Sequence, residues 1–281
     1  MPVINNTAND PSSACDFASA EDRVISNSQQ QIRQYFETLY RAWGRQHWWP
    51  ARTPFEVIVG AYLTQNTSWT NVEYALTNLR RERLLTASGI RRTSLAQLER
   101  LIRPAGYFRQ KAQRLKTFVG FLDQRYGGSL ARMFAEPTAK LREELLALNG
   151  VGPETADSIS LYAGNHAVFV VDAYTRRILE RHGLVSAKAS YEEIRQMFEK
   201  ALAPIAEELA VPKNNADTAH PSIPSGSSHP PSRMSTASRT LVAQVFNEMH
   251  GLIVGVGKHY CKKSGPACEQ CPLKIFLPDA K

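Results

Sequence analysis

An aspartate that follows an apolar run is the residue of this chain best suited to chemistry. Asp172 comes directly after the sequence AVFVV and directly before AYTRRI. A carboxylate in such surroundings can have a raised pKa, or can hold its negative charge against a cationic transition state. An aspartate at the start of a helix is also typical of an N-cap, and on position alone the cap is the favoured interpretation. One residue can perform both roles.

A glycine-flanked turn lies shortly before this aspartate, in LNGVGPETADSI. Gly150 and Gly152 permit positive φ and a close approach of the backbone to another molecule. Pro153 suits the first turn of a helix, and Glu154 suits the positive end of its dipole. The pattern predicts a helix–hairpin–helix whose backbone N–H groups bind a phosphate without reading base sequence. An ordinary tight turn between packed helices is the alternative.

The elements that must position these residues are helices. Apolar residues recur at helical spacing over 55–62 and 115–122, whereas strand-like alternation is scarce. The fold class is therefore predicted to be all-α, with short connections. Residues 1–30 are polar without an apolar period and are expected to be a disordered tail. Residues 211–240 are rich in Pro, Ser and Asn and are expected to be a disordered insertion.

Charge and hydropathy indicate which kind of binding partner the chain could have. The 281 residues have a formal net charge of +8 and a sequence pI near 9.4, which favours a polyanionic partner such as nucleic acid. No apolar run reaches the roughly 20 residues of a membrane span, and no leader pattern is evident. We therefore expect no membrane partner and a cytoplasmic, nucleoid-associated protein.

The hairpin followed by VVDAYTRRI resembles the helix–hairpin–helix DNA glycosylases of the endonuclease III superfamily. The resemblance extends through PFEVIVGAYLTQNTSWTNVEYAL, IRPAGYFRQKAQRLK and the C-terminal cysteines, and so covers the chain from about Gln46 onward. It implies two helical domains flanking a DNA-binding cleft. One is a six-helix domain over 54–161 that contains the hairpin. The other combines 31–53 with 162–281.

The resemblance also assigns residues to DNA. Asp172 matches the catalytic aspartate, and Gln65 matches the residue that fills the gap left by an extruded base, which the enzyme must take out of the stack. A polar residue making a local bond at a helix end is the alternative for Gln65. The residues expected to contact DNA are Gln65, Asn66, Lys111, Leu148, Gly150, Val151, Gly152 and Thr155. The expected partner is double-stranded DNA with damaged bases, bound by a monomer.

One departure from the family bears on the reaction type. Members that also cleave the strand carry a lysine as the second residue after GVG, where this chain has Glu154. A carboxylate cannot form an imine with the sugar. The resemblance therefore implies a monofunctional glycosylase in which water attacks the sugar and Asp172 stabilises the oxocarbenium-like state or orients that water.

Aromatic residues indicate which base is removed. Trp48, Trp49 and Pro50 precede LTQNTSW, and with Trp69 they resemble the base pocket of 3-methyladenine glycosylases of the endonuclease III type. Indole faces attract the cationic ring of an alkylated purine. At least one tryptophan of the pair is expected to be a core residue instead. Mismatched thymine or uracil, and adenine opposite oxidised guanine, remain alternative substrates.

Three cysteines near the C-terminus match part of an iron–sulfur loop. Cys261, Cys268 and Cys271 have the family spacing, but the fourth position falls on Leu277. A [4Fe–4S] cluster normally uses four thiolates. A loop without metal is slightly favoured over a three-cysteine cluster with an outside ligand or a zinc site completed by His259. No cofactor is expected to be required for catalysis.

Two other functions fit parts of the sequence. Glu154 and the incomplete cysteine loop are compatible with a lesion-binding protein that has lost its chemistry, and the family also contains endonucleases that act at abasic or mismatched sites. Asp172 argues against the first, because a binding module has no use for a carboxylate near the duplex. The missing lysine argues against the second.

Overall fold

The computed structural model describes residues 20–210 and 230–278, and within these ranges the chain forms helices and no strands. The predicted all-α class is confirmed. None of the described helices is both long and apolar enough to cross a membrane.

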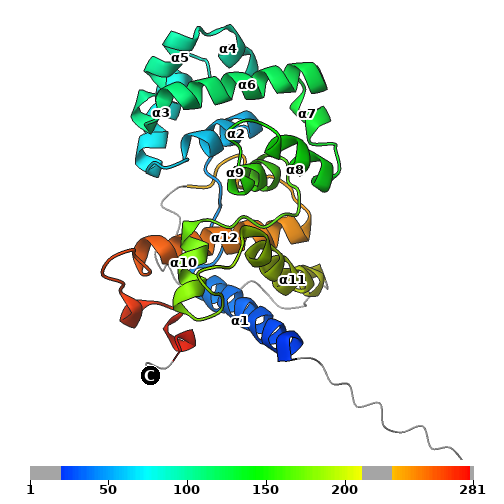
Figure 1. Ribbon diagram of the computed structural model, residues 1–281, viewed down its shortest axis with the longest axis vertical. Coiled ribbons are helices and arrows are strands. Elements are labelled where there is room, and N and C mark those ends of the chain that lie inside the picture. Colours follow the sequence, from blue (N-terminus) through cyan, green and yellow to red (C-terminus); the bar gives the residue numbers. More distant parts are fainter. Residues whose placement is uncertain (1–19, 211–229, 279–281) are drawn as a thin grey trace, which may run out of the picture.

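Eight helices form the upper part of the molecule in Figure 1. The longest of them, α6, packs against α2, α4 and α5, and the two short helices α8 and α9 lie nearest the rest of the chain. Their bounds are α2 Pro54–Leu63, α3 Trp69–Arg81, α4 Ala87–Arg92, α5 Leu95–Leu101, α6 Phe108–Tyr126, α7 Leu130–Met133, α8 Thr138–Leu146 and α9 Pro153–Ser158.

Four helices from the two ends of the described chain form the lower part (Figure 1). Helix α12 packs against α1, α10 and α11, and it also contacts the short helix η2, Ile159–Ala163, that follows α9. The lower part therefore joins the upper part through α12. Its bounds are α1 Ala20–Trp43, α10 Ala173–Arg181, α11 Tyr191–Ala210 and α12 Leu241–His259, followed by the short turns η3 Cys268–Gln270 and η4 Lys274–Phe276.

Hydroxyl side chains fix where many of the helices begin. A Ser or Thr at the N-cap accepts a hydrogen bond from the amide three residues later, which satisfies one of the unpaired donors of the first turn and contributes about 1 kcal/mol. Thr53 does this for α2, Ser68 for α3, Thr86 for α4, Ser94 for α5 and Thr240 for α12. These starts are therefore dictated by local sequence.

The first helix begins earlier than the polar sequence suggests. Helix α1 starts at Ala20, so the expectation of a tail without structure up to residue 30 was wrong for residues 20–30. The reason lies further along the helix, where Ile32, Tyr35 and Leu39 form one fully buried face. That face anchors α1, and the helix continues backward from the anchor. Residues 1–19 lie outside the described residues.

The second half of the predicted insertion is also ordered. Residues 230–240 form a turn in which the amide of Ser232 donates to the Ser235 hydroxyl and the amide of Ser235 donates to the Ser232 hydroxyl. The amide of Met234 donates to the Ala51 carbonyl at 3.1 Å, and the Met234 side chain is buried. The expectation of disorder was therefore wrong for 230–240, because Met234 supplies an apolar anchor. Residues 211–229 lie outside the described residues.

Candidate functional site

The predicted hairpin is present between α8 and α9. Gly150 has φ of 79°, and Gly152 is the N-cap of α9. A Cβ at Gly150 would lie 2.0 Å from Nε of Arg114, so the turn needs glycine for both its conformation and its packing. Within the described residues, the amides of Gly150 and Gly152 donate no hydrogen bond. The hairpin therefore offers backbone donors to a ligand.

Gln65 lies on the hairpin although 85 residues separate the two in sequence. Its side-chain nitrogen donates to the Gly150 carbonyl at 3.0 Å and to the Thr155 hydroxyl at 2.9 Å. Its side-chain oxygen accepts from Arg114 at 2.6 Å. Thr155 is buried, so its hydroxyl holds Gln65 and does not face outward. The structure thus brings the predicted gap-filling residue and the predicted phosphate loop together.

An open hollow of about 480 Å³ passes over this junction. Its walls come from the end of α2, from α6, from the hairpin and from the start of α11. Among the predicted DNA contacts, Val151 is nearly buried, and Leu148 is partly exposed away from the hollow, beside α6. The residues that line it are Ala61, Thr64, Gln65, Asn66, Arg114, Gly150, Gly152, Pro153, Glu154, Thr155, Ser158 and Tyr191.

Lys111 was wrongly predicted to contact DNA. Its side chain is 1% exposed, and its ammonium donates to the carbonyls of Leu63 at 2.9 Å and Ala105 at 2.7 Å. Burial lowers the pKa of this ammonium to about 8, with Arg114 adding to the effect. Lys111 therefore caps the carboxyl ends of two helical segments, as these carbonyls have no partner within their own helices.

Asp172 is the N-cap of α10, as the sequence predicts. Its Oδ1 accepts from the amide of Thr175 at 2.8 Å and from the Thr175 hydroxyl at 2.9 Å. Its Oδ2 lies 3.7 Å from Nε2 of His250. The side chain is 14% exposed. One oxygen is thus occupied by the cap, while the other is left for a second task.

The apolar run before Asp172 is an extended segment held against α11. The amide of Phe169 donates to Glu199, and the amide of Val171 donates to the Tyr191 hydroxyl. The Phe169 ring stacks on Phe198 with centroids 4.2 Å apart. These contacts fix the backbone immediately before the aspartate.

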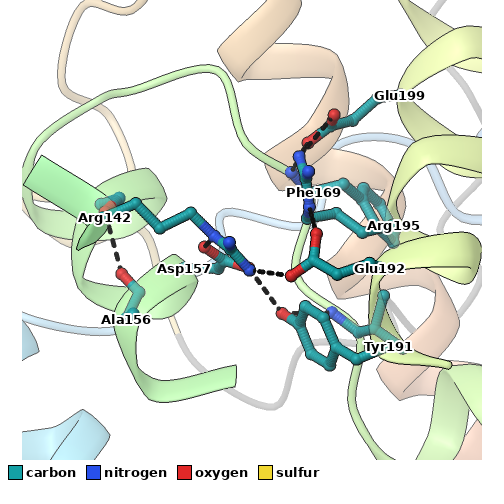
Figure 2. A network of polar contacts seen from close by, with 10 residues as sticks. Arg142, Ala156, Asp157, Phe169, Tyr191, Glu192, Arg195 and Glu199 are labelled. Atoms are coloured by element: carbon teal, nitrogen blue, oxygen red, sulfur yellow. Dashed lines mark hydrogen bonds and ion pairs between the residues drawn. The ribbon is translucent and has the colours of Figure 1, made fainter. Parts of the chain in front are cut away.

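A network of charged side chains connects the hairpin to the same helix (Figure 2). Asp157, fully buried in α9, accepts from Arg142 at 2.7 Å and from the Tyr191 hydroxyl at 2.9 Å. Arg142 also pairs with Glu192, which in turn pairs with Arg195. Because the Tyr191 hydroxyl contacts both Asp157 and the amide before Asp172, the network sets the position of the aspartate relative to the hairpin.

Glu154 stands at the hollow close to Asp172. The side chain is open to water in the hollow, but protein surrounds it on other sides. This partial desolvation raises the pKa of its carboxyl to about 7, and the negative charge of Asp172 adds to the effect. Two carboxyl groups therefore share one region, and the pKa of Glu154 lies near neutral pH.

The four predicted base-pocket residues are not equivalent. Trp49 is 5% exposed and packs between Tyr162 and Trp69, with ring centroids 5.1 Å from each. It is a core residue, so its assignment as a base-stacking surface was wrong, because neighbouring rings already cover it. Trp48, Pro50 and Trp69 are partly exposed. The rings of Trp48 and Trp69 contact Trp49 edge-on, with centroids 5.5 and 5.1 Å away.

Helix α12 holds Trp48 in place. Asn247 donates to the Trp48 carbonyl at 2.6 Å, and Glu248 accepts from the amide of Gln46 at 2.6 Å. A Cβ at Gly251 would lie 3.1 Å from Cβ of Trp48, so the missing side chain lets the two segments approach closely. These α12 residues were not predicted from the sequence. The signal was a polar set at 247, 248 and 250 inside an otherwise apolar helix.

The cysteines cluster as their spacing suggests, but they do not complete a four-thiolate site. Cys261, Cys268 and Cys271 line one small cavity with His182 and Leu277, and Sγ of Cys261 accepts from Arg181 at 3.2 Å. In the described part of the chain, no three His, Cys, Asp or Glu residues are arranged to hold a metal ion. Since Leu277 occupies the fourth position, these residues supply three of the four thiolates that a [4Fe–4S] cluster normally uses.

Several known proteins are similar to this chain in sequence. The profile of the HhH-GPD superfamily base excision DNA repair protein family matches residues 59–204. A Methanocaldococcus jannaschii protein, named as a candidate DNA repair glycosylase, is 40% identical over 252 residues, which are 89% of this chain and 97% of that protein. Endonuclease III of Thermotoga maritima is 28% identical over 221 residues, covering 79% of this chain and 81% of its own.

Solved structures of DNA repair enzymes also resemble this chain. The 3-methyladenine DNA glycosylase of H. pylori, bound to 1,N6-ethenoadenine, superposes with a TM-score of 0.64 at 28% identity, covering 82% of this chain and 97% of its own. An endonuclease III trapped in a covalent intermediate with DNA also gives a TM-score of 0.64, at 22% identity, covering 89% of this chain and 95% of its own. The second likeness concerns the fold alone.

Proposed function

The chain belongs to the HhH-GPD superfamily of base excision DNA repair proteins, whose members are DNA glycosylase enzymes, and from this premise we propose that it removes alkylated purines from duplex DNA by hydrolysis alone. The observation that carries the proposal is that the two carboxylate oxygens of Asp172 have different partners. Thr175 occupies Oδ1, whereas Oδ2 accepts no hydrogen bond from the described residues and is therefore available to the reacting sugar.

The geometry supports a hydrolytic reaction. The hairpin amides hold a DNA phosphate, and Gln65 enters the duplex where the damaged nucleotide leaves the stack. The glycosidic bond breaks with its electron pair going to the base, and Asp172 stabilises the positive charge that develops on the sugar. Water then adds to the anomeric carbon. Glu154, in place of an amine, forms no imine, so the strand stays intact.

Alkylated purines are the substrate class that the aromatic residues favour. Trp48 and Trp69 are partly exposed, and an indole face attracts a cationic purine by roughly 0.5 to 2 kcal/mol when both are desolvated. The H. pylori relative is a 3-methyladenine DNA glycosylase bound to a modified adenine. Such bases are good leaving groups, so one carboxylate is sufficient. The proposed reaction requires no metal.

The test is base release from methylated duplex DNA, with products separated by chromatography and strand breaks scored with and without hot alkali. Wild type is expected to release 3-methyladenine and to leave strands that break only after alkali. Asp172→Asn keeps a good N-cap but loses the charge, so base release should fall by about 100-fold or more, while affinity for the same DNA changes little.

Two results would overturn the proposal. If wild type binds lesion DNA but releases no base from alkylated, deaminated or mismatched duplexes, the chain is a lesion-binding protein. If strands break without alkali, the reaction is not purely hydrolytic.

A further inference from the structure

A buried histidine lies behind the proposed catalytic carboxylate. His250 is 4% exposed in the middle of α12. Three aromatic rings surround it, with centroids 6.0 Å away for Trp48, 5.8 Å for Tyr162 and 6.3 Å for Phe169. Such a site is costly for an imidazole unless both ring nitrogens are used.

The two ring nitrogens have different neighbours. Nδ1 lies 2.7 Å from the hydroxyl of Tyr162, which makes a hydrogen bond. Nε2 is buried, has no hydrogen-bond partner among the described residues, and lies 3.7 Å from Oδ2 of Asp172. That distance is too long for a hydrogen bond, so the contact is electrostatic. Asp172 is thus the charged group that Nε2 faces.

The carboxylate determines the tautomer. An ionised carboxylate only accepts hydrogen bonds, so the favourable arrangement places the proton on Nε2 and leaves Nδ1 to accept from Tyr162. Burial lowers the pKa of His250, and the charge of Asp172 opposes this only in part. The ring is therefore neutral at pH 7 and presents an N–H dipole, not a second charge, to Asp172.

We propose that His250, oriented by Tyr162, is a positioning residue that keeps Oδ2 of Asp172 directed at the sugar. This inference rests on the proposed hydrolysis. Thr175 donates two hydrogen bonds to Oδ1 from one side, and the Nε2–H dipole of His250 faces Oδ2 from the other. A partner in this position acts on the reaction through Asp172 and does not touch the substrate.

The experiment compares three substitutions at one position. In His250→Gln, the amide nitrogen takes roughly the place of Nε2, so the donor toward Asp172 is kept. In His250→Asn, the amide is too short to reach Asp172. In His250→Leu, both ring contacts are lost. Single-turnover base release from methylated DNA, its pH profile and DNA affinity are measured for each.

The chain offers a matched control. His182 is also buried, and its Nδ1 lies 2.7 Å from the Tyr35 hydroxyl, but it lies at the far end of α10 from Asp172. His182→Asn therefore reports the general cost of losing a buried Tyr–His pair. It should leave the rate of base release and its pH profile unchanged.

We expect His250→Asn to slow base release by about 10- to 100-fold with DNA affinity held within about threefold. The loss should appear in the rate and not in affinity, because Asp172 loses the dipole that orients Oδ2. His250→Leu should do the same, and His250→Gln should recover most of the rate. Equal effects of His250→Asn and His182→Asn, or no recovery in His250→Gln, would overturn the inference.

A second measurement separates this inference from the proposed function. The tautomer of the His250 ring is determined by nitrogen NMR in the full chain without DNA. A proton on Nε2 supports the role of His250 even if wild type fails to act on methylated DNA. A proton on Nδ1 contradicts that role whatever the substrate is.

Discussion

The site has a hairpin side, formed by Gln65, Gly150 and Thr155, and a tryptophan side, formed by Trp48, Trp69 and His250. The two sides differ in whether their buried polar atoms have hydrogen-bond partners within the protein. On the hairpin side, the Gln65 amide is bonded to Gly150, Thr155 and Arg114. On the tryptophan side, Nε1 of Trp48 and Nε2 of His250 are buried without a hydrogen-bond partner among the described residues.

This contrast follows from what each side has to meet. A DNA phosphate is the same at every site, so the hairpin can be fully organised in advance by bonds within the protein. An unpaired buried donor costs about 1 to 3 kcal/mol, and it persists where the missing partner arrives with the substrate or where a neighbouring charge compensates. In the proposed function, the tryptophan side is therefore the side that selects the base.

The largest expected effect comes from breaking the network that joins the hairpin to α11. Arg142→Met leaves the Asp157 carboxylate fully buried without its cation, so the free energy of unfolding should fall by about 3 to 5 kcal/mol in urea titrations. Arg125→Met, which removes an exposed partner of Glu144, controls for loss of an ion pair and should cost much less. Similar losses for both variants would mean that the Asp157 network does not stabilise the contact between the hairpin and α11.

A smaller effect is expected from changing the hairpin alone. Gly150→Ala forces a side chain into a left-handed conformation and against Arg114, so it should cost about 1 to 3 kcal/mol of stability and lower DNA affinity about tenfold, measured by anisotropy at fixed salt. Gly183→Ala is the control, since Gly183 has φ of 70° with open space around it. If both variants bind DNA equally well, the hairpin is only a turn.

The smallest effect concerns the carboxyl between the two sides. Folded Glu154 keeps its proton up to about pH 7, whereas in the unfolded chain it loses it near the usual 4.5. The folded state therefore holds the extra proton in this window, and stability falls as pH rises from about 5 to 8. Glu154→Gln should reduce the fall in Tm between pH 5 and pH 8, with Glu143→Gln as the exposed control. An unchanged fall would show that Glu154 is fully solvated.

The sequence predicted those parts of the site that depend on short-range chemistry. Gly150 and Pro153 define the hairpin, and Asp172 caps α10 as an aspartate before a helical stretch should. Sequence also placed three cysteines together through their spacing. It failed for residues whose role depends on what packs over them: Lys111 is at helical spacing with other basic residues, yet it faces inward.

What the sequence by itself determined is therefore the all-α class, the helix starts, the hairpin and the cap, because glycine, proline and hydroxyl side chains act on backbone within a few residues. Only the tertiary structure decided that Trp49 is core, that Gln65 lies on the hairpin and that His250 faces Asp172. These relations join segments up to about 200 residues apart, such as Trp48 and Asn247. Whether a residue is buried, and which charge it faces, depends on the distant segment that packs against it. No local sequence pattern encodes that segment.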